Sequence, residues 1–333
     1  MTVFPGNVGG SGKQEGPVQK SFLAYVVIII ACAAPTLLNW AGFDFGSPNL
    51  GFDIEEIASW KLSYPALEDE MFYALTGGLQ HALLEWSAVS LAIVVGLLSF
   101  VHYRINQDVM VPIIGVAVLC SGFMDAFHTL AATRLIDAVA LNIDLIPVSW
   151  ALSRSFHVVI LLLGVLIVFA YGDAGMKGGK REAQRRLYLL ITVSLLFMAA
   201  AYGLIHLAAT SEDLPRTQFP DSLVTRPYDA IPLALFVLAI PLFLKLYKKK
   251  PTFFSAALIF LLLPEIVLEA HMAFGSSALF DNHFNIAHFL KIVAYLVPLT
   301  GLLLDYVQTH LRVTEEETAR DGPESAASGQ RNR

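Results

Sequence analysis

Residues 77–101 read GGLQHALLEWSAVSLAIVVGLLSFV, an apolar run interrupted by one histidine and one glutamate. About 20 consecutive apolar residues are enough for a helix to cross the hydrocarbon core of a bilayer. The stretch therefore predicts a transmembrane helix. His81 and Glu85 are four residues apart, so they share one face of that helix.

The same kind of stretch occurs seven more times along the chain. The other predicted spans are 21–39, 109–132, 147–171, 187–209, 230–247, 252–274 and 284–306. Charged residues make up 15% of the chain, whereas soluble domains carry roughly 25%. The sequence thus predicts an all-α, polytopic membrane bundle of about eight transmembrane helices. It has no basic region of the kind that binds nucleic acid.

The basic residues indicate how the bundle is oriented. Cytoplasmic loops of membrane proteins are enriched in lysine and arginine. One set of loops and tails holds most of them: Lys13, Lys20, Arg104, Lys177, Lys180, Arg181, Arg185, Arg186, Lys245, Lys248, Lys249, Lys250 and Arg312. The other set holds Lys61, Arg134, Arg216 and Arg226. We therefore expect eight spans with both termini in the cytoplasm.

Three regions follow from this reading. Residues 1–20 are predicted to be a disordered cytoplasmic tail, and 21–306 the eight-span membrane domain. Residues 307–333 are predicted to continue the last span as a cytoplasmic helix and to become disordered after about Arg320. A cleavable signal peptide ending near Ala34 is the less favoured reading of the first span, because its apolar run is long enough to anchor the chain.

Six spans carry a polar pair at a spacing of three or four residues. The pairs are His81/Glu85, Asp125/His128, Arg154/His157, Tyr202/His206, Glu265/Glu269 and His288/Lys291. The predicted orientation places all of them in the outer half of the bundle. A charged side chain at mid-helix costs about 2.5–3.5 kcal/mol on insertion scales, so these side chains are expected to face one another rather than lipid.

The sequence thus predicts a polar cluster as the functional site. Its candidate members are His81, Glu85, Asp125, His128, Arg154, His157, His206, Glu265, Glu269, His288 and Lys291. Imidazole and carboxylate groups on facing helices can bind a transition metal, and the candidate ligands are His81, Glu85, His128, His157 and His288. Haem between two histidines, a polar pocket for a small molecule, proton uptake and a purely structural ion-pair network are the alternatives.

Five stretches carry a resemblance to a known family. They are HALLE at 81–85, GFMDAFHTL at 122–130, WALSR at 150–154, FPD at 219–221 and NIAHFLKIVAY at 285–295. In this order they resemble the membrane-associated sensor domains, third named type, found at the N-termini of bacterial diguanylate cyclases and sensor kinases. The resemblance covers about residues 75–306. It implies an input module of the bacterial inner membrane whose signal leaves through the last helix.

Two functions are compared on this basis. The favoured one is a sensory module that binds a small ligand, metal, haem or protons and acts on a cytoplasmic partner or through a homodimer. Family members usually continue into an output domain, and this chain ends soon after the last span. The alternative is a metal-dependent membrane enzyme, resembling a lipid hydrolase, in which a metal-bound water is the nucleophile. Membrane lipid is an expected partner in both cases.

Overall fold

The computed structural model describes residues 22–47, 59, 63–171 and 179–329. Within these residues it contains nine helices, eight of which are long and apolar enough to cross a membrane. The bounds of the spanning helices are α2 Phe22–Trp40, α5 Thr76–Asn106, α6 Met110–Ala132, α7 Asn142–Tyr171, α8 Lys180–Thr210, α9 Ala230–Lys249, α10 Phe253–Phe274 and α11 Asn282–Gly329. The prediction of an all-α bundle with eight spans is confirmed.

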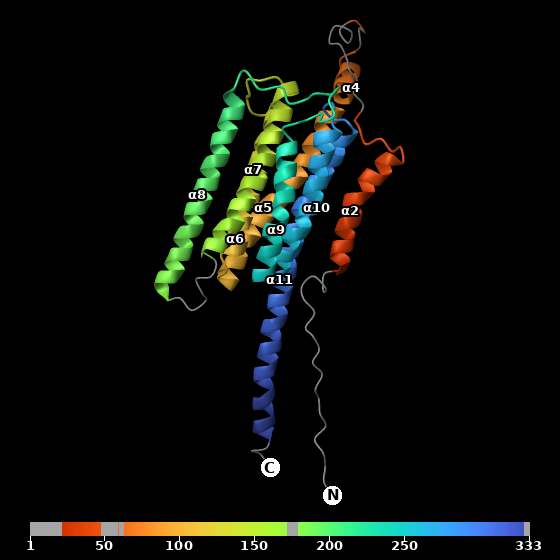
Figure 1. Ribbon diagram of the computed structural model, residues 1–333. Helices are drawn as coiled ribbons and strands as arrows, with labels where there is room; N and C mark the ends of the chain where they lie inside the picture. Colours follow the sequence, from red (N-terminus) through yellow and green to blue (C-terminus); the bar gives the residue numbers. More distant parts are fainter. Residues whose placement is uncertain (1–21, 48–58, 60–62, 172–178, 330–333) are drawn as a thin grey trace.

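The spanning helices stand side by side and form one bundle (Figure 1). Helix α6 lies inside it, buried along nearly its whole length and packed against α5, α7 and α8. Helices α10 and α11 form the other large contact, and α5 joins the two groups by packing on α11 as well. The site-bearing faces of α5, α6, α7, α10 and α11 therefore meet in the interior.

Small residues allow the closest helix approaches. A Cβ atom on Gly301 of α11 would lie 2.4 Å from the Cβ of Ala257 and 2.9 Å from the Phe253 carbonyl oxygen of α10. Such contacts are typical of membrane helices, which associate through close packing because lipid is as apolar as their side chains. Glycine at 301 thus fixes how near α11 lies to α10.

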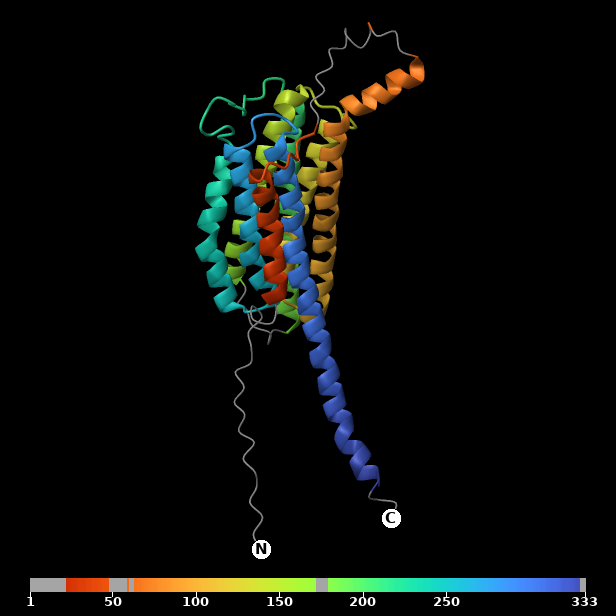
Figure 2. The same ribbon diagram turned by 90° about the vertical axis from the view of Figure 1, so that its right-hand side faces the viewer.

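Two elements differ from the sequence prediction. Residues Tyr64–Ala74, between the first two predicted spans, form a short helix, α4, where no helix was predicted, and it projects from one end of the bundle (Figure 2). Helix α11 continues to Gly329, past Arg320, where the sequence prediction has the helix end. Glutamate, alanine and arginine are frequent in this extension and are good helix formers. The predicted disordered tail at 1–20 lies outside the described residues.

Candidate functional site

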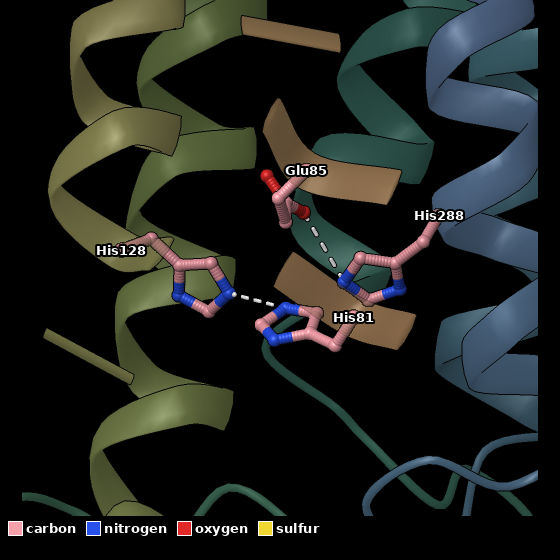
Figure 3. A group of neighbouring side chains, drawn as sticks. All are labelled: His81, Glu85, His128 and His288. Atoms are coloured by element: carbon pink, nitrogen blue, oxygen red, sulfur yellow. Dashed lines mark hydrogen bonds and ion pairs between the residues drawn. The ribbon is translucent and has the colours of Figure 1, made fainter. Parts of the chain in front are cut away.

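Three histidines and one glutamate come together in the interior. His81 and Glu85 come from α5, His128 from α6 and His288 from α11, and their side chains point toward one another (Figure 3). One nitrogen or oxygen atom of each lies within 4.8 Å of the corresponding atoms of the others. All four residues are buried, with at most 1% of their surface exposed. We call this set the His3Glu cluster.

Two of the distances within the His3Glu cluster match those of atoms around a common ion. The Nε2 atoms of His81 and His128 are 3.1 Å apart, and His288 Nε2 is 3.2 Å from Glu85 Oε1. A tetrahedral zinc ion binds histidine nitrogen at about 2.0–2.1 Å, which places neighbouring ligand atoms about 3.3 Å apart. The cluster is therefore close to a metal-binding geometry.

Hydrogen bonds outside the cluster fix the tautomers of two histidines. His288 Nδ1 is 2.7 Å from the Phe284 carbonyl oxygen, which can only accept, so Nδ1 carries the proton. His128 Nδ1 is 2.7 Å from Ser149 Oγ, and Ser149 donates its single proton to the Leu145 carbonyl oxygen at 2.5 Å. Nδ1 of His128 is therefore also a donor. Both Nε2 atoms therefore carry a lone pair that faces the cluster, as a metal ligand requires; that of His128 accepts from His81 Nε2 at 3.1 Å, and that of His288 has no hydrogen-bond partner among the described residues.

Lys291 connects this cluster to a second carboxylate. Its ammonium group donates to both oxygens of Glu85, at 2.9 and 2.8 Å, and lies 2.9 Å from Asp125 Oδ1. Asp125 also accepts from Ser153 Oγ at 2.6 Å and from Tyr295 Oη at 2.9 Å. Since Lys291 and Tyr295 both lie on α11, that helix is linked to α5 through Glu85 and to α6 through Asp125.

A second buried group lies between α7 and α10. Arg154 donates through Nε to Glu269 Oε1 at 2.7 Å and through Nη2 to Glu265. His157 contacts Glu265 Oε1 at 3.1 Å with Nε2, and Ser121 Oγ at 2.7 Å with Nδ1. These charges are paired, which explains how they are accommodated in the interior. His157, predicted as a metal ligand, lies here and apart from the His3Glu cluster.

Trp150 lies between the two groups. Its ring centroid is 4.3 Å from that of His288 and 4.7 Å from Lys291 Nζ, and the guanidinium carbon of Arg154 lies 5.8 Å from it. The negative face of an indole ring stabilises cations. Trp150 belongs to the WALSR stretch at 150–154, and the sequence alone predicts no role for it, because an aromatic residue in a span usually packs against other helices or lies at the membrane interface.

One ion pair was not anticipated. Arg226, in the loop before α9, donates through Nε to Asp229 Oδ2 at 2.6 Å, and both residues are fully buried. Burial raises the pKa of the Asp229 carboxyl, and the nearby guanidinium groups of Arg226 and Arg154 oppose that rise. The sequence feature that could have predicted this pair is an arginine and an aspartate three residues apart, directly before a predicted span.

His206 is not brought to the other candidates. It lies on the exposed face of α8 and stacks on Tyr202, with ring centroids 6.1 Å apart. The expectation that this pair faces the interior is therefore wrong, because α8 turns that face outward. The remaining ten candidates are all buried and lie in the two groups described above.

A family model described as a membrane-associated sensor domain, MASE3, matches residues 78–309. The chain belongs to this family. The match covers more than half of the chain and includes all the residues of the His3Glu cluster and of the Arg154 group. It confirms the resemblance found in the sequence and gives a multi-pass membrane protein with a sensory input role. Neither the curated proteins nor the solved structures contain a match to this chain.

Proposed function

We propose that this chain is an input module of the bacterial inner membrane that senses a divalent transition-metal ion at the His3Glu cluster. The observation that carries the proposal is the convergence of two Nε2 lone pairs, on His128 and His288, with His81 and Glu85. Imidazole and carboxylate donors suit zinc and its first-row neighbours. The Ser149 hydroxyl and the Phe284 carbonyl oxygen hold the two imidazole rings in the tautomer that a metal ligand needs.

The charge balance of the interior supports a dication. The two groups around the His3Glu cluster and Arg154 contain four buried carboxylates and two buried cations. The carboxylates are those of Glu85, Asp125, Glu265 and Glu269, and the cations are Arg154 and Lys291. The Arg226–Asp229 pair is neutral as a unit. With every carboxylate ionised and the histidines neutral, the group carries two excess negative charges. An ion of charge +2 neutralises it in a region where unbalanced charge is costly.

The number of candidate ligands favours a metal-sensing site over a metal-dependent enzyme or a haem site. Structural zinc sites are closed by four protein ligands, whereas catalytic zinc keeps one position for water or substrate. The His3Glu cluster offers four ligands, so a lipid hydrolase is less well supported. A haem group needs two histidines far enough apart to hold the flat macrocycle between them. Here the donor atoms from three helices lie within 4.8 Å of one another, so haem is less well supported.

Helix α11 provides a route for the signal. A dication bound to Glu85 repels the Lys291 ammonium, and Asp125, already 2.9 Å from Lys291, can take over the pairing. The link between α11 and α5 is then exchanged for a stronger link between α11 and α6. Because α11 runs without interruption from His288 to Gly329, this change reaches its far end. A cytoplasmic partner or a second copy of the chain would read it there.

The binding test uses the full chain in detergent or nanodiscs, titrated with cobalt(II) as a spectroscopic probe and with zinc in competition. We expect one ion per chain and the intense visible bands of tetrahedral cobalt. His128→Ala should abolish these bands. His206→Ala, which changes an exposed histidine of α8, is the matched control and should bind as the wild type does. Equal binding by both variants, or no binding by the wild type, would overturn the proposed metal site.

The sensing test measures whether zinc binding changes the environment of α11 beyond the bundle. A bimane label on Leu311→Cys, an exposed position, reports the environment of the helix after the bundle. Zinc should change its emission in the wild-type background and leave it unchanged with Lys291→Met. A chain that binds zinc without any change at the label would not be a sensor acting through α11.

A further inference from the structure

An apolar groove lies between α2 and the sensor module. Its volume is about 340 Å³, within the range of about 300–1,000 Å³ typical of small-molecule sites. Helix α2 contributes Ala31, Ala34, Pro35 and Leu38, and Phe45 follows it in the chain; Gln80 and Leu84 of α5 and Asn285, Ile286 and Phe289 of α11 complete the lining. Leu38 and Phe289 are both 41% exposed, so the groove is open at the surface of the bundle.

The groove exists because α2 is fastened to the bundle at separate points. Tyr25 stacks on Phe260 of α10 with ring centroids 3.6 Å apart, and Thr36 Oγ1 is 2.9 Å from His271 Nε2. Figure 2 shows α2 in front of α10 and α11, on the outside of the bundle. The family match begins at residue 78, so α2 lies outside the matched residues.

Polarity is sorted along the groove. Its polar lining residues, Gln80 and Asn285, lie at one end, where Ser47 Oγ donates to Gln80 Oε1 at 2.7 Å and Asn285 donates to the Phe45 carbonyl oxygen at 2.8 Å. Asn285 is 3% exposed, and its Oδ1 has no hydrogen-bond partner among the described residues. Toward the middle of the bilayer the walls are entirely apolar. The groove thus offers hydrocarbon contact below a buried hydrogen-bond acceptor.

We propose that this groove holds an acyl chain of a phospholipid from the outer leaflet. The groove is formed by membrane-spanning residues, so hydrocarbon surrounds its open side. The sorted polarity matches a chain whose glycerol end lies near Gln80 and Asn285 and whose hydrocarbon lies against the apolar walls. Gln80 and Leu84 directly precede His81 and Glu85 in the chain, so the bound lipid rests beside the turns that carry the His3Glu cluster.

The test uses the full chain in liposomes that contain phosphatidylglycerol with a photoreactive diazirine in one acyl chain. After illumination, crosslinked peptides are mapped by mass spectrometry. We expect crosslinks on the groove walls of α2 and on Ile286 and Phe289 of α11. Ala34→Trp fills the groove and should abolish the crosslinks to α11.

The matched control is Ile30→Trp, which places the same side chain on α2 at a residue that is 60% exposed and does not line the groove. It should leave the crosslinks to α11 unchanged. Retained thermal stability of both variants shows that they fold. Crosslinks that are spread evenly over the exposed helix faces, or that decrease equally in both variants, would overturn the proposal.

Discussion

The hydroxyl group of Ser149 decides which nitrogen of His128 faces the other ligands. It accepts from Nδ1 of His128 at 2.7 Å, so its removal frees the imidazole to change tautomer. Losing such an outer partner typically lowers metal affinity by about 10–100-fold. We therefore expect Ser149→Ala to weaken zinc binding by that amount, measured by competition with a chelating dye.

The control for this change is Ser87→Ala, at an exposed serine whose hydroxyl donates to the Leu83 carbonyl oxygen of its own helix. It should bind zinc as the wild type does. Wild-type affinity in Ser149→Ala would mean that the tautomer of His128 is set in some other way.

Residue spacing predicted which side chains share a helix face, and it could not predict where that face points. Ten of the eleven candidates are buried together, because charge and hydrocarbon are incompatible. His206 has the same spacing to its neighbour and points outward, since an aromatic pair is tolerated near the membrane surface. The serines that orient the histidines could not be selected from the sequence, because serine occurs throughout the spans.

At the scale of helices, α10 and α11 are joined at the end opposite the site. The Asp305 carboxylate accepts hydrogen bonds from the backbone N–H groups of Phe253 and Phe254, at 2.9 and 3.0 Å. These N–H groups lie in the first turn of α10, where they have no acceptor within their own helix. Asp305→Ala leaves both donors without this acceptor. We expect a loss of about 1–3 kcal/mol of stability, seen as a lower unfolding temperature in detergent.

Metal binding should survive this change, because Asp305 lies five turns along α11 from His288. Thr309→Ala is the control, since its hydroxyl donates to the Asp305 carbonyl oxygen of the same helix. Equal unfolding temperatures for Asp305→Ala and the wild type would show that the contact does not hold the two helices together.

The lengths of the membrane-spanning helices could be predicted, because the thickness of the bilayer sets them. The lengths of helices outside the bilayer could not. All eight spans lie where hydropathy places them, because about 20 residues must cover the hydrocarbon core. Helix α4 and the extension of α11 lie outside that constraint. There, weak local propensities decide, and the sequence signal is correspondingly weak.

For the whole molecule, the distribution of basic residues predicts the orientation. Arg186 donates to the Gln107 carbonyl oxygen at 3.1 Å and Lys250 to Asp108 at 2.7 Å, so the basic loops gather at one end of the bundle. The His3Glu cluster lies toward the other end. By the positive-inside rule we expect the basic end to be cytoplasmic, which would place the cluster beneath the outer surface.

This orientation can be tested in intact cells with a membrane-impermeant maleimide. Both native cysteines, Cys32 and Cys120, are buried and should give a low background. Asp221→Cys, in the loop before α9, should react in intact cells, whereas Arg185→Cys in α8 should react only after permeabilisation. The reverse pattern would place the cluster beneath the cytoplasmic surface. The metal ion sensed would then be that of the cytoplasm, and α11 would report to the outside.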